Sequence, residues 1–150
     1  MARILITGMS GAGKSTLLAE LARRGVATVD TDYGGYTIDD RLWHVEKMDA
    51  LLASHDELVV SGTVENQGAF YQRFAAVVLL SAPLETLLER VRTREGAGYG
   101  RTPEQQDDIR RYTAEVEPLL RRNATHELDS RGPVAELADE LMTLLRGHDA

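Results

Sequence analysis

Residues 8–15 read Gly-Met-Ser-Gly-Ala-Gly-Lys-Ser and fit the pattern G-x-x-x-x-G-K-S/T. A short β-branched run at 3–7 precedes this stretch, and leucines at helical spacing follow it. A glycine-rich turn between a strand and a helix lets successive backbone N–H groups point inward, and the start of the helix adds unpaired N–H groups. The stretch therefore predicts a phosphate-binding loop.

The residue types in this loop predict specific contacts with a nucleoside triphosphate and its metal ion. The ammonium group of Lys14 would reach the β- and γ-phosphates, and the hydroxyl of Ser15 would ligate Mg²⁺. The nucleotide-binding residues expected from the loop are Gly8, Ser10, Gly11, Ala12, Gly13, Lys14, Ser15 and Thr16.

Composition sets the broad class of the chain. It has 150 residues, of which 43% are apolar and 27% charged, and this favours one folded domain over 1–150. A net charge of −7 argues against a non-specific nucleic-acid binder. The absence of cysteine excludes disulfides and thiolate metal sites. Apolar runs are too short to span a bilayer and no signal-peptide pattern is present, so we expect a soluble, cytoplasmic monomer without membrane or nucleic-acid partners.

Apolar periodicity predicts strands that alternate with helices. The expected strands are 3–7, 26–29, 58–60, 75–80 and 125–128. The expected helices are 15–24, 39–54 and 67–73, followed by helices that open at Pro83, Pro103 and Pro133. Alternation of this kind indicates βαβ units, and hence an α/β domain with a parallel sheet that is covered on both faces.

Two of these helices carry specific expectations. The helix at 39–54 would place Leu42 and Met48 on one apolar face. Residues 102–105 read Thr-Pro-Glu-Gln and predict a capping box. The helix that follows would turn one face inward, formed by Ile109, Tyr112, Val116 and Leu119.

Other classes of P-loop protein match the sequence less well. A switch GTPase needs an N-K-x-D segment, which is absent. A motor or AAA-type ATPase needs an apolar strand that ends in an acidic pair, whereas the corresponding strand here ends Val60-Ser61-Gly62. Both classes are therefore disfavoured.

Several further motifs occur in a characteristic order. They are Val29-Asp30-Thr31-Asp32 after the second strand, Val59-Val60-Ser61-Gly62, Arg92-Thr93, Arg101-Thr102-Pro103, and residues 125–130 with Pro133. In this order the chain resembles the small P-loop kinases of the shikimate kinase and gluconate kinase group, relatives of the nucleoside monophosphate kinases. The resemblance implies a three-layer fold with a five-stranded parallel sheet in the order 2-3-1-4-5. It also implies a lid at about 95–103 and an acceptor-binding region at about 32–55.

The resemblance also implies roles for single residues. Asp30 would hold Mg²⁺ through water, and Asp32 would accept a hydrogen bond from the acceptor hydroxyl or take its proton. Arg101 would move over the γ-phosphate. Pro133 would lie against adenine, and Arg92 would stack on adenine or form a surface ion pair instead.

The chain departs from the shikimate kinases where those enzymes hold a carboxylate. Ser61-Gly62-Thr63 replaces their glycine triplet, residues 41–44 replace a Phe-Arg pair, and residues 115–117 replace a late arginine. A shikimate kinase is therefore disfavoured, and we expect Trp43 to belong to the core. The acceptor-binding residues expected are Asp32, Tyr33, Arg41, Gly62, Thr63 and Asn66.

Together these features predict a kinase that uses ATP and Mg²⁺ to phosphorylate a hydroxyl of a small metabolite or drug, with Lys14, Asp32 and Arg101 as catalytic residues. One alternative is a nucleoside or nucleotide kinase on the same scaffold. An alternative of another class is a regulatory protein that binds a nucleotide without turnover.

Overall fold

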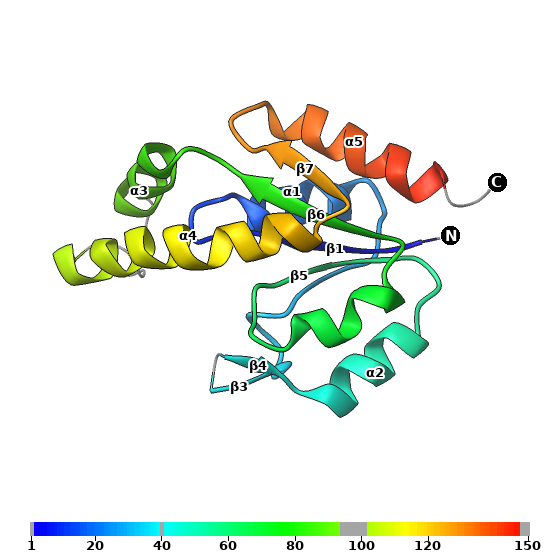
Figure 1. Ribbon diagram of the computed structural model, residues 1–150. Coiled ribbons are helices and arrows are strands. Elements are labelled where there is room, and N and C mark those ends of the chain that lie inside the picture. Colours follow the sequence, from blue (N-terminus) through cyan, green and yellow to red (C-terminus); the bar gives the residue numbers. More distant parts are fainter. Residues whose placement is uncertain (1, 40, 94–101, 148–150) are drawn as a thin grey trace.

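Five parallel strands form the central sheet of the computed structural model, which describes residues 2–39, 41–93 and 102–147 (Figure 1). The strands are β1 (Arg3–Thr7), β2 (Thr28–Asp30), β5 (Leu58–Ser61), β6 (Ala76–Ser81) and β7 (His126–Asp129). Their order in the sheet is β2-β5-β1-β6-β7. This order confirms the expected arrangement 2-3-1-4-5, and it brings the carboxyl ends of β1, β2 and β5 to one edge.

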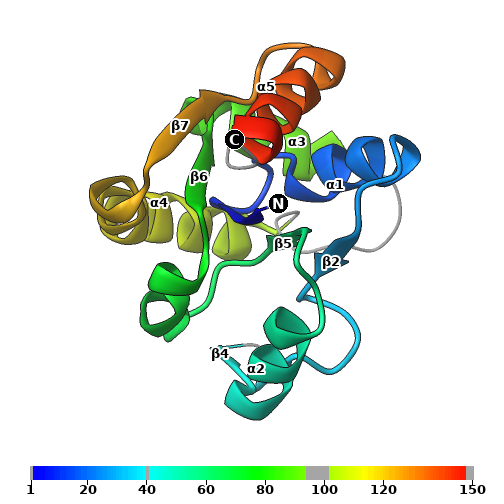
Figure 2. The same cartoon turned by 90° about the vertical axis from the view of Figure 1, so that its right-hand side faces the viewer.

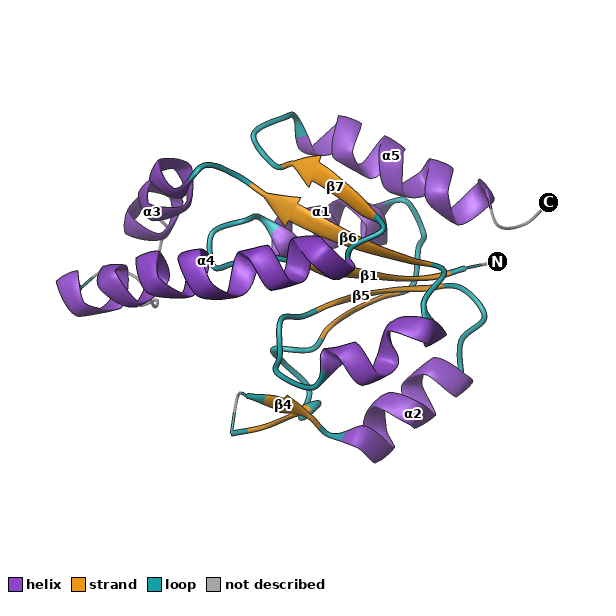
Figure 3. Ribbon diagram, in the orientation of Figure 1, coloured by secondary structure: helices purple, strands orange, loops and turns teal. Residues whose placement is uncertain are grey.

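Helices cover both faces of the sheet and complete the three layers (Figure 2). The helices are α1 (Lys14–Arg23), α2 (Val45–Ala53), the 3₁₀ helix η1 (Gln67–Arg73), α3 (Leu84–Thr93), α4 (Pro103–Asn123) and α5 (Val134–Gly147). Helices α1 and α5 lie together on one face, whereas α2, η1 and α4 lie on the other (Figure 3). No helix in the described ranges is both long and apolar enough to cross a bilayer.

The core is divided by the sheet because successive side chains of a strand point to opposite faces. On β1, Ile4 and Ile6 pack in the cluster that contains the leucines of α1 and α5. Leu5, between them, packs instead with Met48 and Leu52 of α2. All five side chains are fully buried, so β1 lies at the centre of the molecule.

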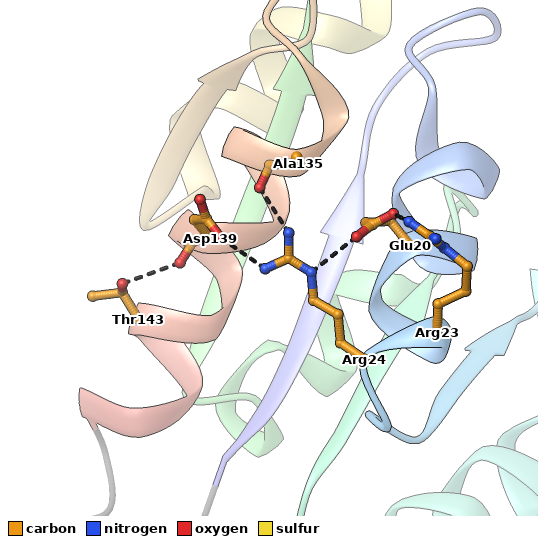
Figure 4. Close-up of polar contacts among 6 residues, drawn as sticks. All are labelled: Glu20, Arg23, Arg24, Ala135, Asp139 and Thr143. Carbon is orange, nitrogen blue, oxygen red and sulfur yellow. Dashed lines mark hydrogen bonds and ion pairs between the residues drawn. The ribbon is translucent and has the colours of Figure 1, made fainter.

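A polar contact joins α5 to the end of α1 (Figure 4). The Arg24 guanidinium donates to Glu20 at 2.9 Å, to Asp139 at 2.7 Å and to the carbonyl oxygen of Ala135 at 3.1 Å. This polar contact lies beside the buried leucines through which α1 and α5 pack against each other. The first turn of α5 is thereby held near α1, the helix that follows the glycine-rich loop.

The expected helix at 39–54 is wrong at its start. A hairpin of β3 (Thr37–Ile38) and β4 (Leu42–Trp43) occupies its first part, and α2 begins only at Val45. The indole of Trp43 is buried, as expected, and the Asn66 side chain binds the Trp43 main chain at both N (2.8 Å) and O (3.1 Å). These contacts with a distant segment favour extended backbone over a first helical turn.

The capping box of α4 is confirmed, but two residues of its expected inner face, Tyr112 and Leu119, are exposed. Thr102 and Gln105 bond each other's backbone N–H groups. Tyr112 is 44% exposed and Leu119 is 50% exposed, whereas Ile109 and Leu120 are buried. Ile109 and Leu120 are separated by eleven residues, which is close to three turns of an α-helix, so both lie on the inner face. Leu119, one position earlier, lies outside that face.

Candidate active site

A cavity of about 410 Å³ lies in front of the loop between β1 and α1, and we call it the loop cavity. Its lining residues are Ser10, Gly11, Ala12, Gly13, Lys14, Ser15, Thr16, Asp32 and Arg90. Seven of the predicted nucleotide-binding residues are thus gathered around one space. The first turn of α1 opens into it, so the positive end of that helix faces the cavity.

Close packing of the loop against the sheet explains the glycine at its first position. A Cβ atom on Gly8 would lie 2.4 Å from the carbonyl oxygen of Leu80, which is backbone and cannot move away. Across the loop, the Lys14 ammonium donates to the carbonyl oxygens of Gly8 at 2.5 Å and Met9 at 3.2 Å. The lysine charge is therefore held at the mouth of the loop.

An acidic pair at the end of β2 faces the loop. The Ser15 hydroxyl donates to Asp30 Oδ2 at 2.9 Å, and the Asp32 backbone N–H donates to Asp30 Oδ1 at 3.1 Å. Within the described residues, no three histidine, aspartate or glutamate side chains gather into a metal cluster. A site of one hydroxyl and one carboxylate fits Mg²⁺, which commonly keeps water and substrate phosphate oxygens as its other ligands.

Arg90 of α3 is the loop-cavity residue that the sequence reasoning missed. Its guanidinium donates to the carbonyl oxygens of Gly11 (3.1 Å) and Ala12 (3.4 Å), and to Ser130 Oγ (2.9 Å) and O (2.7 Å). It therefore joins the phosphate-loop backbone to the segment before α5. Arg90 and Arg92 both flank the buried Val91, so the apolar periodicity of the helix does not show which of the two faces the phosphate loop.

A second, smaller cavity of about 270 Å³ adjoins the loop cavity, and we call it the α5 cavity. Ala12, Gly13, Thr16 and Arg90 line both spaces. The remaining lining residues are Leu17, Ser130, Gly132, Val134 and Leu137. The α5 cavity thus lies beside Ser130, which belongs to the segment 125–130 that the resemblance places near adenine.

The two residues predicted to contact adenine lie outside the lining of the α5 cavity. Gly132 and Val134 line it, but Pro133 between them does not. Arg92 forms the surface ion pair given above as the alternative, with its Nη2 atom 3.6 Å from Glu89. Stacking of Arg92 on adenine stays a prediction, as does the role of Pro133.

A third space of about 540 Å³, the α4 cavity, opens on the other side of the phosphate loop. Lys14 and Asp32 line both this space and the loop cavity. The other lining residues are Gly8, Met9, Ser10, Arg41, Thr63, Val64, Glu65, Tyr112, Val116 and Leu120. Tyr112 and Val116 were both predicted to face inward; both line this cavity, but Tyr112 is exposed.

The expected acceptor residues are only partly brought together. Asp32, Arg41 and Thr63 line the α4 cavity. Asn66 lies outside that lining because its amide group binds the Trp43 backbone. Tyr33, which is 73% exposed, is also outside it.

Gly62 is buried and serves packing. A Cβ atom at this position would lie 2.4 Å from Thr31 Oγ1 and 3.2 Å from the indole of Trp43. The neighbouring Thr63 hydroxyl donates to the Gly8 carbonyl oxygen at 2.6 Å and accepts from the Gly8 N–H at 3.1 Å. The segment after β5 is thus joined to the first residue of the phosphate loop.

A cluster of charges lies at the ends of β6 and β7. Arg121 donates to Glu127 at 2.9 Å and to Glu117 at 2.8 Å. The bond with Arg121 lowers the pKa of Glu127. The bonds from Arg131 lower the pKa of Asp129 to about 2. These carboxylates are therefore ionised at neutral pH and face arginines rather than the phosphate loop.

The predicted catalytic Arg101 and most of the expected lid at 95–103 lie outside the described residues. The described chain resumes at Thr102, whose side chain caps α4.

The sheet order and the loop define the class of the protein: it has the α/β fold of P-loop kinases. The chain belongs to the AAA_18 family, described as an AAA domain, which matches residues 4–111. At the level of the family, this membership runs against the expectation that disfavoured AAA-type ATPases. The described chain nevertheless has no acidic pair at the end of β5, where Val60 and Ser61 stand.

Several solved structures that are similar to this chain are named as kinases of small molecules. Shikimate kinase from Acinetobacter baumannii, in complex with shikimate, shares 23% identity over 99% of this chain and 94% of its own, with a TM-score of 0.71. The enzyme from Aquifex aeolicus shares 18% over 98% of both chains, with a TM-score of 0.68. A sugar kinase from a Janibacter species shares 18% over 96% and 94%, with a TM-score of 0.66. At these identities the likeness shows a shared fold. No curated protein matches the chain.

Proposed function

We propose that the protein, as one kinase domain over 1–150, transfers the γ-phosphoryl group of ATP to a hydroxyl of a small molecule and requires Mg²⁺. The observation that carries the proposal is that Lys14 and Asp32 line both the loop cavity and the α4 cavity. A phosphoryl group held at the loop would therefore meet an acceptor in the α4 cavity beside a carboxylate. Phosphoryl transfer depends mainly on such positioning and on charge neutralisation.

In the proposed reaction, the acceptor oxygen forms a bond to the γ-phosphorus while the bond from that phosphorus to the β,γ-bridging oxygen breaks. The Asp32 carboxylate orients the attacking hydroxyl and receives its proton. The Lys14 ammonium and the inward N–H groups of the loop stabilise the negative charge on the phosphoryl oxygens. Binding of the γ-phosphate would require Lys14 to leave the carbonyl oxygens that it contacts here.

Magnesium would be held by the Ser15 hydroxyl and, through water, by Asp30. When bound, the ion neutralises charge on the β- and γ-phosphates. Asp30 already accepts from both Ser15 and the Asp32 backbone, so its carboxylate is positioned without the ion. Arg101, by resemblance, would add a further positive charge at the γ-phosphate.

A nucleotide kinase would need arginines for the phosphate of its acceptor. Arg41 and Arg73 are the candidates in the sequence. Arg41 is paired with Glu65 at 2.7 Å, and Arg73 is paired with Asp49. Both guanidinium groups thus already face carboxylates, which supports an acceptor other than a nucleotide.

The experiment that tests the proposal is replacement of Lys14 by alanine, with ADP formation followed in the presence of ATP, Mg²⁺ and a panel of metabolites and antibiotics. The wild-type protein should show acceptor-dependent ADP formation, and Lys14→Ala should lose at least about 100-fold in rate. Arg23→Ala, at the exposed end of the same helix, is the control and should keep full activity. A Lys14→Ala variant as active as the control would refute the proposal. ATP binding without any acceptor-dependent turnover would favour the regulatory alternative.

A further inference from the structure

We infer that Thr63 is a positioning residue of the proposed kinase: its hydroxyl holds the Gly8 carbonyl oxygen of the phosphate loop, so that Lys14 can leave this oxygen and turn to the nucleotide. This role rests on the proposed function, which requires that movement of Lys14. It also moves Thr63 from the acceptor-binding residues, where the sequence reasoning placed it, to the residues that prepare the loop for ATP.

The Thr63 hydroxyl binds both polar groups of the first residue of the loop. It donates to the Gly8 carbonyl oxygen at 2.6 Å and accepts from the Gly8 N–H at 3.1 Å. A third contact, of 3.1 Å, joins it to the Thr7 hydroxyl. A hydroxyl has one proton and two lone pairs. Because the proton of Thr63 lies on the bond to Gly8, Thr7 is the donor of the third contact, and the Thr63 hydroxyl has no position left for an acceptor molecule.

A buried amide fixes the direction of this chain of hydrogen bonds. Gln67, which is 2% exposed, accepts from the Val64 N–H at 2.8 Å through Oε1. Its Nε2 group therefore faces the other way and donates to Thr7 Oγ1 at 3.1 Å. The Thr7 hydroxyl is fully buried, accepts this bond and donates its own proton to Thr63. Hydrogen bonds arranged head to tail in this way strengthen one another, which favours donation from Thr63 to Gly8.

The Gly8 carbonyl oxygen is shared between Thr63 and Lys14. It accepts from the Lys14 ammonium at 2.5 Å as well as from the Thr63 hydroxyl. Gly8 is buried, so the loss of hydrogen bonds to its oxygen would carry the desolvation cost of that group. When Lys14 turns to the phosphates, Thr63 keeps the oxygen bonded. Without the hydroxyl, the departure of Lys14 would remove the second of these bonds from a buried carbonyl oxygen, and the ammonium would be held back.

Three variants test this role through the nucleotide. Thr63→Val keeps the shape of the side chain and removes the hydroxyl, Thr63→Ser keeps the hydroxyl, and Thr143→Val makes the same change as the first at an exposed position of α5. Calorimetry with ATP and Mg²⁺ should show binding about tenfold weaker in Thr63→Val and within about twofold of the wild type in the other two. In assays of ADP formation, the KM for ATP should rise by the same factor in Thr63→Val. The KM for the acceptor should stay within about twofold, because the hydroxyl does not contact the acceptor.

A double-mutant cycle without nucleotide tests the shared oxygen directly. In Thr63→Val the Gly8 oxygen keeps the bond from Lys14, and in Lys14→Met it keeps the bond from Thr63, whereas the double variant loses both. The urea midpoint of the double variant should therefore fall by about 0.5 M more than the sum of the two single losses. Bonds from either side chain to other groups cancel in the cycle. A merely structural role of Thr63 would give additive losses.

The outcomes separate this role of Thr63 from the proposed function. Additive losses in the urea cycle would show that Thr63 does not act through Lys14, and so would a Thr63→Val variant that raises the acceptor KM at unchanged ATP affinity; in both cases the kinase stands. A Thr63→Ser variant that binds ATP as weakly as Thr63→Val would assign the effect to the methyl group and would also overturn the role. If the wild type binds no ATP, the proposed function fails, and the role of Thr63 fails with it whatever the urea cycle shows.

Discussion

Replacement of Arg90 by methionine tests whether α3 holds the phosphate loop in shape. Nη1 divides its contact between the carbonyl oxygens of Gly11 and Ala12, which we count as one bond, and two more bonds go to Ser130. Three bonds from a half-buried guanidinium, at about 1 kcal/mol each, give a loss of about 3 kcal/mol in the free energy of unfolding. Methionine keeps much of the side-chain volume, so little of the loss would come from a cavity.

The loss can be read from urea denaturation followed by far-ultraviolet circular dichroism. With a denaturant slope of about 2 kcal/mol per M, the midpoint should fall by about 1.5 M. The KM for ATP should rise about tenfold, because the loop N–H groups lose their fixed orientation. The control is Arg110→Met, which removes an exposed pair with Asp107 and should lose at most about 0.5 kcal/mol. If both variants unfold at the same urea concentration, the account of Arg90 is wrong.

Three further predictions address the metal site, the charge cluster and the packing beside β5. Asp30→Asn should weaken the apparent affinity for Mg²⁺ by about 10- to 100-fold, as seen in a titration of activity, because Ser15 and the metal waters lose a carboxylate; an unchanged titration would contradict the role of Asp30. The pKa of Asp129 is lowered from 3.8 to about 2 by Arg131, so its stabilising effect is present above about pH 4 and is lost as the pH falls toward 2. The difference in urea midpoint between the wild type and Asp129→Asn should therefore shrink over that pH range, and a constant difference would count against the ion pair. Gly62→Ala should lower the free energy of unfolding by about 1–3 kcal/mol through overpacking, measured in the same urea assay, and a midpoint equal to that of the wild type would show that the site has room for a methyl group.

Local signals were sufficient to predict the five strands and the phosphate loop, whereas the order of the strands came from the resemblance. The motif at 8–15 lies between a strand and a helix, and alternation along the chain gave the remaining strands. The hairpin at 37–43 could not be predicted in this way, because its apolar residues also fit a helical spacing. Its conformation depends on Asn66, which binds the Trp43 main chain from 23 positions away.

The candidate site likewise contains residues that could be predicted from the sequence and residues that could not. The roles of Asp30 and Asp32 come from the resemblance, which places an acidic pair after the second strand; Asp30 accepts from Ser15 of the loop, and Asp32 lines the loop cavity. The contact of Arg90 with the phosphate loop could not be predicted from the residues around it, because only the fold brings α3 against Gly11. The place of Tyr112 and Val116 in the lining of the α4 cavity likewise depends on how α4 packs against the sheet, which the pattern of a single helix does not specify.

Trp43 gives the molecule a built-in optical reporter. It is the only tryptophan of the chain, it is buried, and its indole N–H donates to Thr31 Oγ1 at 2.9 Å, one residue before Asp32. Emission from such an indole depends on this bond and on the dryness of its surroundings. Any ligand that displaces the segment around Asp32 will therefore change the fluorescence of a single chromophore, which allows occupancy to be followed in a cuvette without a label.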